Sequence, residues 1–290
     1  MGWRRAVKFI CLLVVLAGGV ARGQDGSSRM AVLPLHGTGE GHFGTPDDEM
    51  YQMVVATFLK TRRFDLLERH RLDDVLHEAK FQNSGLVDDS SAVALGKLLG
   101  VKWVVIGSYK GELVSIYGDK KGEESFFRYF TGKVVLSLRM VDVETGKIQE
   151  TFDAAGGSRD STLAKAQASL LLDCTGKLER EVANKFPLRG VVLRVEKEKE
   201  IMTDLGRKDG LAVGDRFQIL AIAEDAIHPV TGKVIKGAPR PVAEAEVLSV
   251  GEESSIMKIT DGKDEVKPGL FLESIKRKAG KWERFMDKLK

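Results

Sequence analysis

The sequence has few of the residues that interrupt or cross-link a chain, with only seven prolines and two cysteines among its 290 residues. Its 31 glycines are scattered, and with so few prolines they exclude a collagen-like chain. Hydrophobic residues make up 43% of the sequence and charged residues 30%, a balance that excludes intrinsic disorder. The length is sufficient for one large domain or two modest ones.

Long hydrophobic runs are also missing after the N-terminus. The run Phe9–Ala17 is too short to span a bilayer, which requires about 20 apolar residues. It follows a basic segment and precedes Ala21 and Gly23, which have the spacing of a small-x-small cleavage site. We therefore expect residues 1–23 to be a signal peptide cleaved after Gly23. The alternative is an uncleaved membrane anchor.

Removal of this segment changes the charge and the cysteine count. The formal net charge at pH 7 changes from +3 to −1, because residues 1–23 contain four basic residues and no acidic one. A mature chain so close to neutral gives no indication of nucleic-acid binding. Cys11 is lost as well, which leaves Cys174 alone and excludes an internal disulfide framework. The residue directly after Gly23 is Gln24 and not a lipid-accepting cysteine, so we expect an exported protein without a lipid anchor.

The hydrophobic pattern after the leader indicates two domains. The first, residues 24–186, is predicted to be an α/β (α+β) domain with one mixed sheet in the order β-α-β-α-α-β-β-β-α. The expected strands are 30–35, 64–68, 101–106, 133–143 and 147–152, and the expected helices begin after Thr45-Pro46, near Leu72, at Ser90 or Ser91, and near Asp160. The last helix is expected to end at Lys185.

A different pattern begins near Pro187, where short strands follow one another with Gly and Pro between them. The expected strands are 191–195, 217–223, 242–250, 255–259 and 270–275. This spacing predicts that residues 187–275 form a small all-β barrel.

One motif resembles a dinucleotide-binding loop. Gly39–Gly44 has the spacing G-x-G-x-x-G between a predicted strand and a predicted helix. In dinucleotide-binding folds, however, the helix begins inside the motif, whereas Thr45-Pro46 place the helix start after its last glycine. We interpret the segment as a surface loop and keep a nucleotide-binding enzyme as the alternative.

No other motif indicates catalysis. His70 and His77 are seven residues apart and lack a third ligand at metal-binding spacing, so we expect solvated side chains. Cys174 lies on one helical stripe with Leu171 and Leu178, which indicates a buried thiol. We therefore predict no catalytic residues, no bound metal and no cofactor.

The segment Phe64–Glu78 resembles the signature of the CsgG family, the curli-secretion proteins, and the likeness continues through residues 81–108. With Ala31–Leu35 and Val141–Ile148 it covers most of residues 30–185. The resemblance implies a non-catalytic envelope protein of diderm bacteria, with a fold shared by the activators of penicillin-binding proteins. In the curli channels this domain assembles into rings.

Two departures limit what the resemblance implies. The curli channels are lipid-anchored, and they insert two membrane hairpins per subunit, for which Gly156–Thr162 is too short. We therefore expect Glu112–Gly132 to be an extended hairpin outside the membrane that contacts a partner. Its predicted contact residues are Phe126, Phe127, Tyr129 and Phe130.

The second domain is faintly similar to the C-terminal barrel of the flagellar assembly protein T family, through Asp204–Gly206, Val213–Phe217 and Pro229–Lys233. The basic tail 276–290 follows it and is expected to form a short amphipathic helix. One face of this helix would carry Trp282, Phe285, Met286 and Leu289. That face either docks on a partner or an anionic membrane, or packs on the protein itself.

The function predicted from the sequence is that of a non-enzymatic, exported component of an assembly machinery at the outer membrane. The expected partners are envelope proteins, a second copy of the chain in a ring, and a peripheral membrane contact, but no nucleic acid. The alternatives are an activator of a peptidoglycan synthase and a nucleotide-binding enzyme that uses the Gly39–Gly44 loop.

Overall fold

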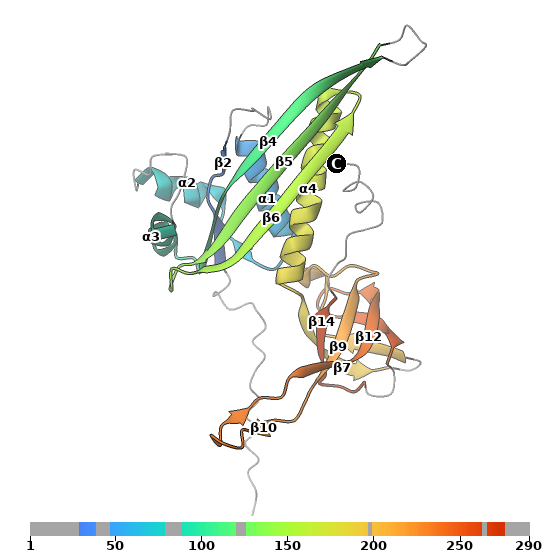
Figure 1. Cartoon of the computed structure of the whole chain (residues 1–290). Helices are drawn as coiled ribbons and strands as arrows, with labels where there is room; N and C mark the ends of the chain where they lie inside the picture. Colours follow the sequence, from blue (N-terminus) through green and yellow to red (C-terminus); the bar gives the residue numbers. More distant parts are fainter. Residues whose placement is uncertain are drawn as a thin grey trace, which may run out of the picture.

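The computed structural model describes residues 29–38, 47–78, 89–119, 126–196, 199–262 and 266–275. The N-terminal part is a mixed sheet covered by helices, and the C-terminal part is a closed barrel (Figure 1). They confirm the predicted combination of an α+β domain that has a mixed sheet with a barrel that follows it. The predicted signal peptide, the Gly39–Gly44 loop and the tail 276–290 lie outside the described residues.

The sheet combines short parallel strands with a long antiparallel meander. Its strands are β1 (Arg29–Val32), β2 (His36–Gly37), β3 (Asp65–Leu66), β4 (Trp103–Asp119), β5 (Phe126–Asp142) and β6 (Ile148–Asp160). They lie in the order β3-β1-β4-β5-β6, and β2 pairs with β4. The pairs β1–β3, β1–β4 and β2–β4 are parallel, whereas β4–β5 and β5–β6 are antiparallel. The two-residue strand β2 was not predicted.

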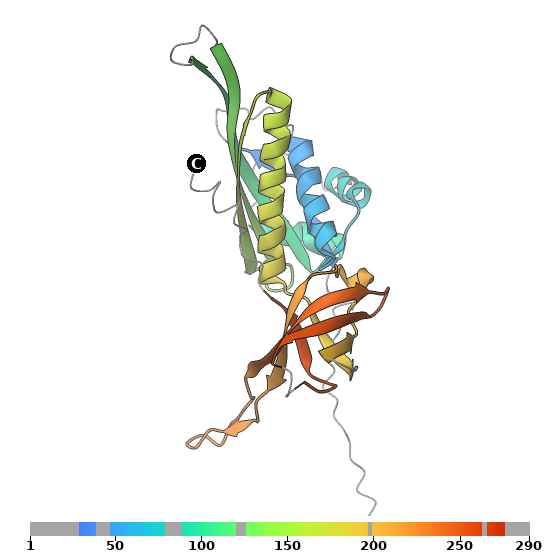
Figure 2. The same cartoon turned by 90° about the vertical axis from the view of Figure 1, so that its right-hand side faces the viewer.

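Two long helices, α1 (Asp47–Thr61) and α4 (Leu163–Lys185), pack against one face of the sheet (Figure 2). On β5 this face carries Val134, Leu136, Leu138 and Met140, all buried. Between them, Lys133, Val135, Ser137 and Arg139 point to the other face of β5 and are exposed, which explains the period of two in this part of the sequence. The hydroxyl of Thr162 caps α4 by accepting a hydrogen bond from the Lys165 amide.

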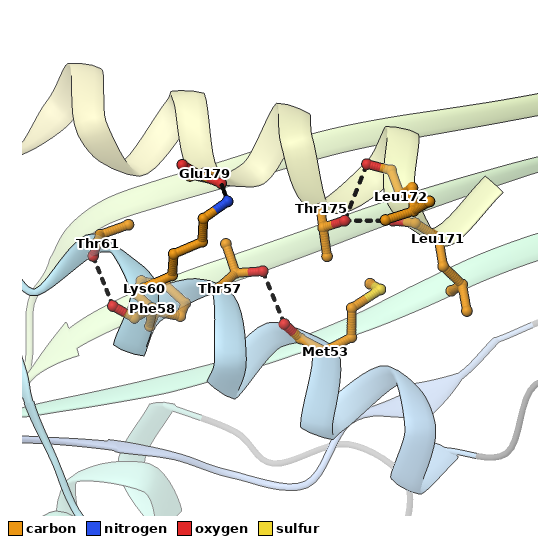
Figure 3. Close-up of polar contacts among 9 residues, drawn as sticks. All are labelled: Met53, Thr57, Phe58, Lys60, Thr61, Leu171, Leu172, Thr175 and Glu179. Carbon is orange, nitrogen blue, oxygen red and sulfur yellow. Dashed lines mark hydrogen bonds and ion pairs between the residues drawn. The ribbon is translucent and has the colours of Figure 1, made fainter. Parts of the chain in front are cut away.

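Helices α1 and α4 also contact each other directly (Figure 3). The Thr57 hydroxyl donates to the Met53 carbonyl at 2.8 Å, and the Thr175 hydroxyl donates to the Leu171 carbonyl at 2.7 Å. These hydroxyls are therefore satisfied within their own helices. An ion pair of 2.6 Å between Lys60 and Glu179 joins the two helices at the edge of their contact.

Two shorter helices, α2 (Arg69–Glu78) and α3 (Asp89–Leu99), complete the domain. Helix α3 packs on the face of the sheet opposite α4, where Gly96 approaches Val104 so closely that an added Cβ would lie 2.8 Å from its side chain. An ion pair of 3.4 Å between Asp89 and Arg139 lies on the same face. Within the described residues, none of the helices has the combination of length and apolar character that a membrane crossing requires.

The C-terminal barrel closes in the strand order β12-β13-β8-β7-β14-β9. Its strands are β7 (Arg189–Val195), β8 (Glu200–Thr203), β9 (Arg216–Ile222), β12 (Pro239–Val250), β13 (Ser255–Asp261) and β14 (Phe271–Ser274). Phe217, Ile219, Met257 and Leu272 fill its interior and have no exposed area. A separate hairpin, β10 (Ala226–Ile227) and β11 (Val234–Ile235), projects from the barrel (Figure 1). Strand β8 and this hairpin were not predicted.

Two arginines after α1 join the domains. The Arg62 guanidinium donates to the Arg207 carbonyl at 2.9 Å, and Arg63 donates to the carbonyls of Phe186 at 2.8 Å and Asp209 at 3.4 Å. A cavity of about 440 Å³ lies beside this junction, between the C-terminal end of α4 and the barrel. Two of its charged lining residues, Arg216 and Glu244, form an ion pair of 2.5 Å with each other. Barrel and sheet domain thus meet through polar contacts.

Candidate functional site

The described part of the chain contains a two-stranded arm that extends beyond the rest of the sheet. Strands β4 and β5 are each 17 residues long and pair from Trp103–Asp142 to Asp119–Phe126. Strand β6 accompanies them only as far as the pair Phe130–Asp160. From this pair onward, residues 115–119 and 126–130 form a ribbon that no other strand or helix of the described residues covers (Figure 1). We call this ribbon the arm.

One face of the arm carries an arginine between two aromatic rings. The Arg128 guanidinium lies 5.2 Å from the ring centre of Tyr117 and 4.6 Å from that of Phe130. Tyr117 is the cross-strand partner of Arg128, and Phe130 follows two residues later on the same strand. Each such cation–π contact contributes about 0.5–1 kcal/mol at an exposed site. The contacts hold the charged side chain in a fixed orientation at the surface.

The other face carries a second arginine–aromatic contact. Arg159, near the end of β6, lies 4.0 Å from the ring centre of Tyr129. Strand geometry places neighbouring residues on opposite faces, so Tyr129 and Phe130 point in opposite directions. The four aromatic residues predicted as contacts therefore do not form one cluster. Phe126 and Phe127 lie on β5, but the structure describes only their backbone.

The remaining predicted contact residues, Trp282, Phe285, Met286 and Leu289, lie outside the described residues. Sequence reasoning missed Tyr117, Arg128 and Arg159, which supply the partners of the aromatic rings. A β-propensity pattern marks the strands, but the contacts depend on the register between β4, β5 and β6. That register is set by the fold of the whole sheet.

The start of α1, next to the Gly39–Gly44 loop, is acidic. Asp47, Asp48 and Glu49 occupy its first turn. The Asp47 carboxylate accepts hydrogen bonds from the Tyr109 hydroxyl at 2.5 Å and from the Gly37 amide at 3.2 Å. Burial, together with this hydrogen bond, raises the pKa of Tyr109 well above its usual value. Three carboxylates at a helix N-terminus interact favourably with the helix dipole and repel a phosphate group. This charge argues against nucleotide binding here.

No group of three or more potential metal ligands occurs among the residues that the structure describes. His70 lies on α2 at 3.7 Å from Asp74, one turn further along the same helix, and both side chains are largely exposed. Cys174 on α4 is fully buried, and its thiol donates to the Ala154 carbonyl on β6 at 3.7 Å. The prediction of a buried cysteine on the apolar stripe of the helix is therefore confirmed.

Cys174 is expected to resist alkylation in the folded protein. Burial, with a smaller contribution from the Asp173 charge, raises the pKa of its thiol to about 11. The thiol is therefore protonated at pH 8 in the folded protein. As the pH rises from about 9 toward 11, an unfolded chain releases this proton more readily than the folded one, so the free energy of unfolding decreases over this range. A maleimide at pH 8 should label the native protein over hours and the urea-unfolded protein within minutes, as measured by mass spectrometry. Rapid labelling of the native protein would contradict this burial.

Comparisons with known proteins give one family match. Residues 44–185 match the model of the family described as curli production assembly/transport component CsgG. A search of curated proteins finds no match. The matched segment includes the helices α1 to α4 and the strands β3 to β6, and therefore the whole arm.

Solved structures give only distant similarities. The C-terminal domain of LpoB from Salmonella enterica is 16% identical, with a TM-score of 0.34 over 47% of this chain and 86% of that chain. Lipoprotein GNA1162 from Neisseria meningitidis is 14% identical, with a TM-score of 0.36 over 50% of this chain and 96% of that chain. A PelC dodecamer from Paraburkholderia phytofirmans is 13% identical, with a TM-score of 0.27 over 53% of this chain and 89% of that chain. With TM-scores this low, we base no functional argument on these structures.

The family match agrees with the resemblance that the sequence shows in Phe64–Glu78 and around it. It ends at Lys185, the last residue of α4, so the barrel is not part of it. Residues 44–185 thus form a domain of the CsgG type, the family whose model they match.

Proposed function

We propose that this protein is an exported, non-enzymatic component of the cell envelope that helps to assemble a secretion or surface-structure machinery at the outer membrane. The observation that carries the proposal is the arm, an uncovered ribbon with arginine–aromatic pairs on both faces, on a CsgG-family domain. The mechanism is protein–protein contact, in which the arm binds an envelope partner.

The composition of the arm suits such a contact. Tyrosine and arginine are enriched among the residues that dominate protein interfaces. Tyr117 is 66% exposed, and Arg128 is held against it before any partner binds. A side chain that is already ordered loses less conformational entropy on binding, so more of the contact energy contributes to affinity.

Two further elements belong to the same proposal. The match of residues 44–185 to the CsgG family supports assembly of several copies, in which each arm would contact a neighbouring subunit or a shared partner. The amphipathic tail, with Trp282 and Phe285, would supply a second contact to a partner or a membrane. The acidic start of α1 supports a role without nucleotide binding.

Crosslinking in the native envelope tests the proposed role of the arm. A photoreactive amino acid at Tyr117 should give a discrete crosslinked product, whereas the same group at Leu172 should not. Leu172 is the matched control because it is 73% exposed on α4 and lies outside the arm. Mass spectrometry of the product identifies the partner, and a peptidoglycan synthase in this product would favour the alternative function.

Arm substitutions are expected to reduce the yield of this product. Arg128→Ala combined with Tyr129→Ala removes one member of each arginine–aromatic contact, and we expect at least a tenfold lower yield, since interface hot spots typically exceed about 2 kcal/mol. Leu172→Ala should leave the yield unchanged. Equal yields from the two probe positions, or an unchanged yield in the double variant, would contradict the proposal.

A further inference from the structure

The β10–β11 hairpin exposes an aliphatic surface at the end of the molecule opposite the arm. Both views show it projecting from the barrel, away from the sheet domain (Figures 1 and 2). The exposed fractions of its side chains are 71% for Ile227, 86% for Val230, 53% for Val234 and 48% for Ile235. Ile227 and Val234 are cross-strand partners and lie on one face of the hairpin, whereas Ile235 lies on the other face. Exposed apolar residues such as Ile227, Val230 and Val234 mark a contact surface. The hairpin lies outside the segment that matches the CsgG family.

The backbone amides of the turn are satisfied within the hairpin itself. Nδ1 of His228 accepts from the amides of Val230 and Thr231, each at 3.2 Å. The amide of His228 donates to the Lys233 carbonyl, and the amide of Gly232 donates to the His228 carbonyl, each at 2.9 Å. The Lys233 amide reaches the Thr231 hydroxyl at 3.5 Å, and Pro229 has no amide hydrogen. The turn therefore presents no unpaired amide between residues 228 and 233. A backbone that enters hydrocarbon needs such pairing, because no water is present there to bind its amides.

The tip of the hairpin carries one positive charge and no negative charge. Residues 226–235 contain Lys233 and no acidic residue. Asp225, at the base, is paired with Lys236 at 2.7 Å, and its second oxygen accepts from the Gly237 amide at 3.0 Å. The acidic group nearest the tip is thereby neutralised locally, while Lys233 faces outward beside the aliphatic side chains. A lysine next to apolar side chains is typical of segments that lie in the interface of an anionic membrane.

A protein pocket fits the same hairpin less well. Interface hot spots are enriched in Trp, Tyr and Arg, and residues 223–238 contain none of the three. The apolar side chains that the tip offers are Ile, Val and Pro, which interact with hydrocarbon without a shaped partner. The tip extends at most about 13 Å from Ala226 to Val230, at roughly 3.3 Å per residue, so it can enter one leaflet but cannot cross a bilayer of about 30 Å.

We propose that the β10–β11 hairpin is a membrane-contact element that inserts Ile227, Val230 and Val234 shallowly into an anionic lipid surface. This contact is separate from the proposed function of the arm. The arm lies at the other end of the molecule and remains free for a protein partner while the hairpin is inserted (Figure 1).

Vesicle binding tests this proposal with the purified exported protein. In co-sedimentation with vesicles of phosphatidylglycerol and phosphatidylethanolamine, we expect Ile227→Ser combined with Val230→Ser to weaken binding at least tenfold. The matched control is Val213→Ser combined with Leu248→Ser, which removes exposed aliphatic side chains of the barrel outside the hairpin. The control should bind like the unaltered protein, and both double variants should keep its melting temperature.

A fluorescent label separates the hairpin from other membrane contacts. An environment-sensitive dye on Val230→Cys should shift to shorter wavelength when vesicles are added, whereas the same dye on Val213→Cys should not. The buried Cys174 leaves the introduced thiol as the reactive one. The tail variant Trp282→Ala with Phe285→Ala should keep the shift. Unchanged binding of the hairpin variant, absence of the shift, or a shift that rises with protein concentration without vesicles would each overturn the proposal.

Discussion

Phe58→Ala is expected to lower the free energy of unfolding by about 3–5 kcal/mol, the usual range for loss of a buried phenylalanine. Phe58 on α1 has no exposed area. Its ring lies edge-on to Phe64 at 5.6 Å and to Phe152 of β6 at 5.5 Å between ring centres. Truncation would leave a cavity where α1, β3 and β6 meet. It would also remove two aromatic contacts beyond the lost apolar burial.

Urea denaturation followed by circular dichroism measures this loss. The matched control is Leu59→Ala, because Leu59 is the next residue of α1 and is 52% exposed. The control should change the free energy of unfolding by less than about 0.5 kcal/mol. A loss of less than about 1 kcal/mol in Phe58→Ala would show that the aromatic cluster is not the centre of the core.

Gly156→Ala is expected to destabilise the protein by about 2–3 kcal/mol, near the upper range for overpacking. Gly156 lies on β6 directly beneath α4. A Cβ at this position would lie 2.7 Å from the Leu170 carbonyl oxygen and 2.9 Å from the Cβ of Cys174. Both contacts involve the helix backbone or an atom attached to it, so α4 itself would have to move. Thermal unfolding should show a clear decrease of the melting temperature.

The same substitution on the helix provides the control. Gly176 on α4 has nothing within 4 Å of an added Cβ, and its backbone is helical. Gly176→Ala should stabilise the protein by about 0.5–1 kcal/mol, because alanine is the better helix former. Opposite signs for the two substitutions would confirm the close approach of α4 to β6. Two changes of the same sign would refute it.

The helices and the paired faces of the sheet could be predicted because they follow local patterns. Val134, Leu136, Leu138 and Met140 alternate with exposed residues, since α4 covers only one face of β5. The apolar stripe with Leu170 and Cys174 likewise indicated the long helix. Such patterns depend only on the layer that packs against the element. They can therefore be recognised in the sequence before the whole fold is known.

The arm and the smaller strands could be predicted only in part. Most of β4 beyond Tyr109 has no consistently buried face, so the expected strand stopped at Ile106 although β4 continues to Asp119. Strand β8 was missed because a run of alternating lysine and glutamate precedes it and only Ile201 and Thr203 point inward. Contacts such as Arg159 with Tyr129 depend on the register of distant segments, which a single sequence does not reveal.

The junction between the domains determines how the molecule responds to tension. If the arm and the hairpin are both held, the load runs along β4, β5 and β6, whose hydrogen bonds lie across the pull and must break together. At the junction the load passes through the chain after Phe186 and the contacts of Arg62 and Arg63. Under tension the contacts between the two domains should therefore break first. The molecule would lengthen by separation of the two folded domains before either domain unfolds.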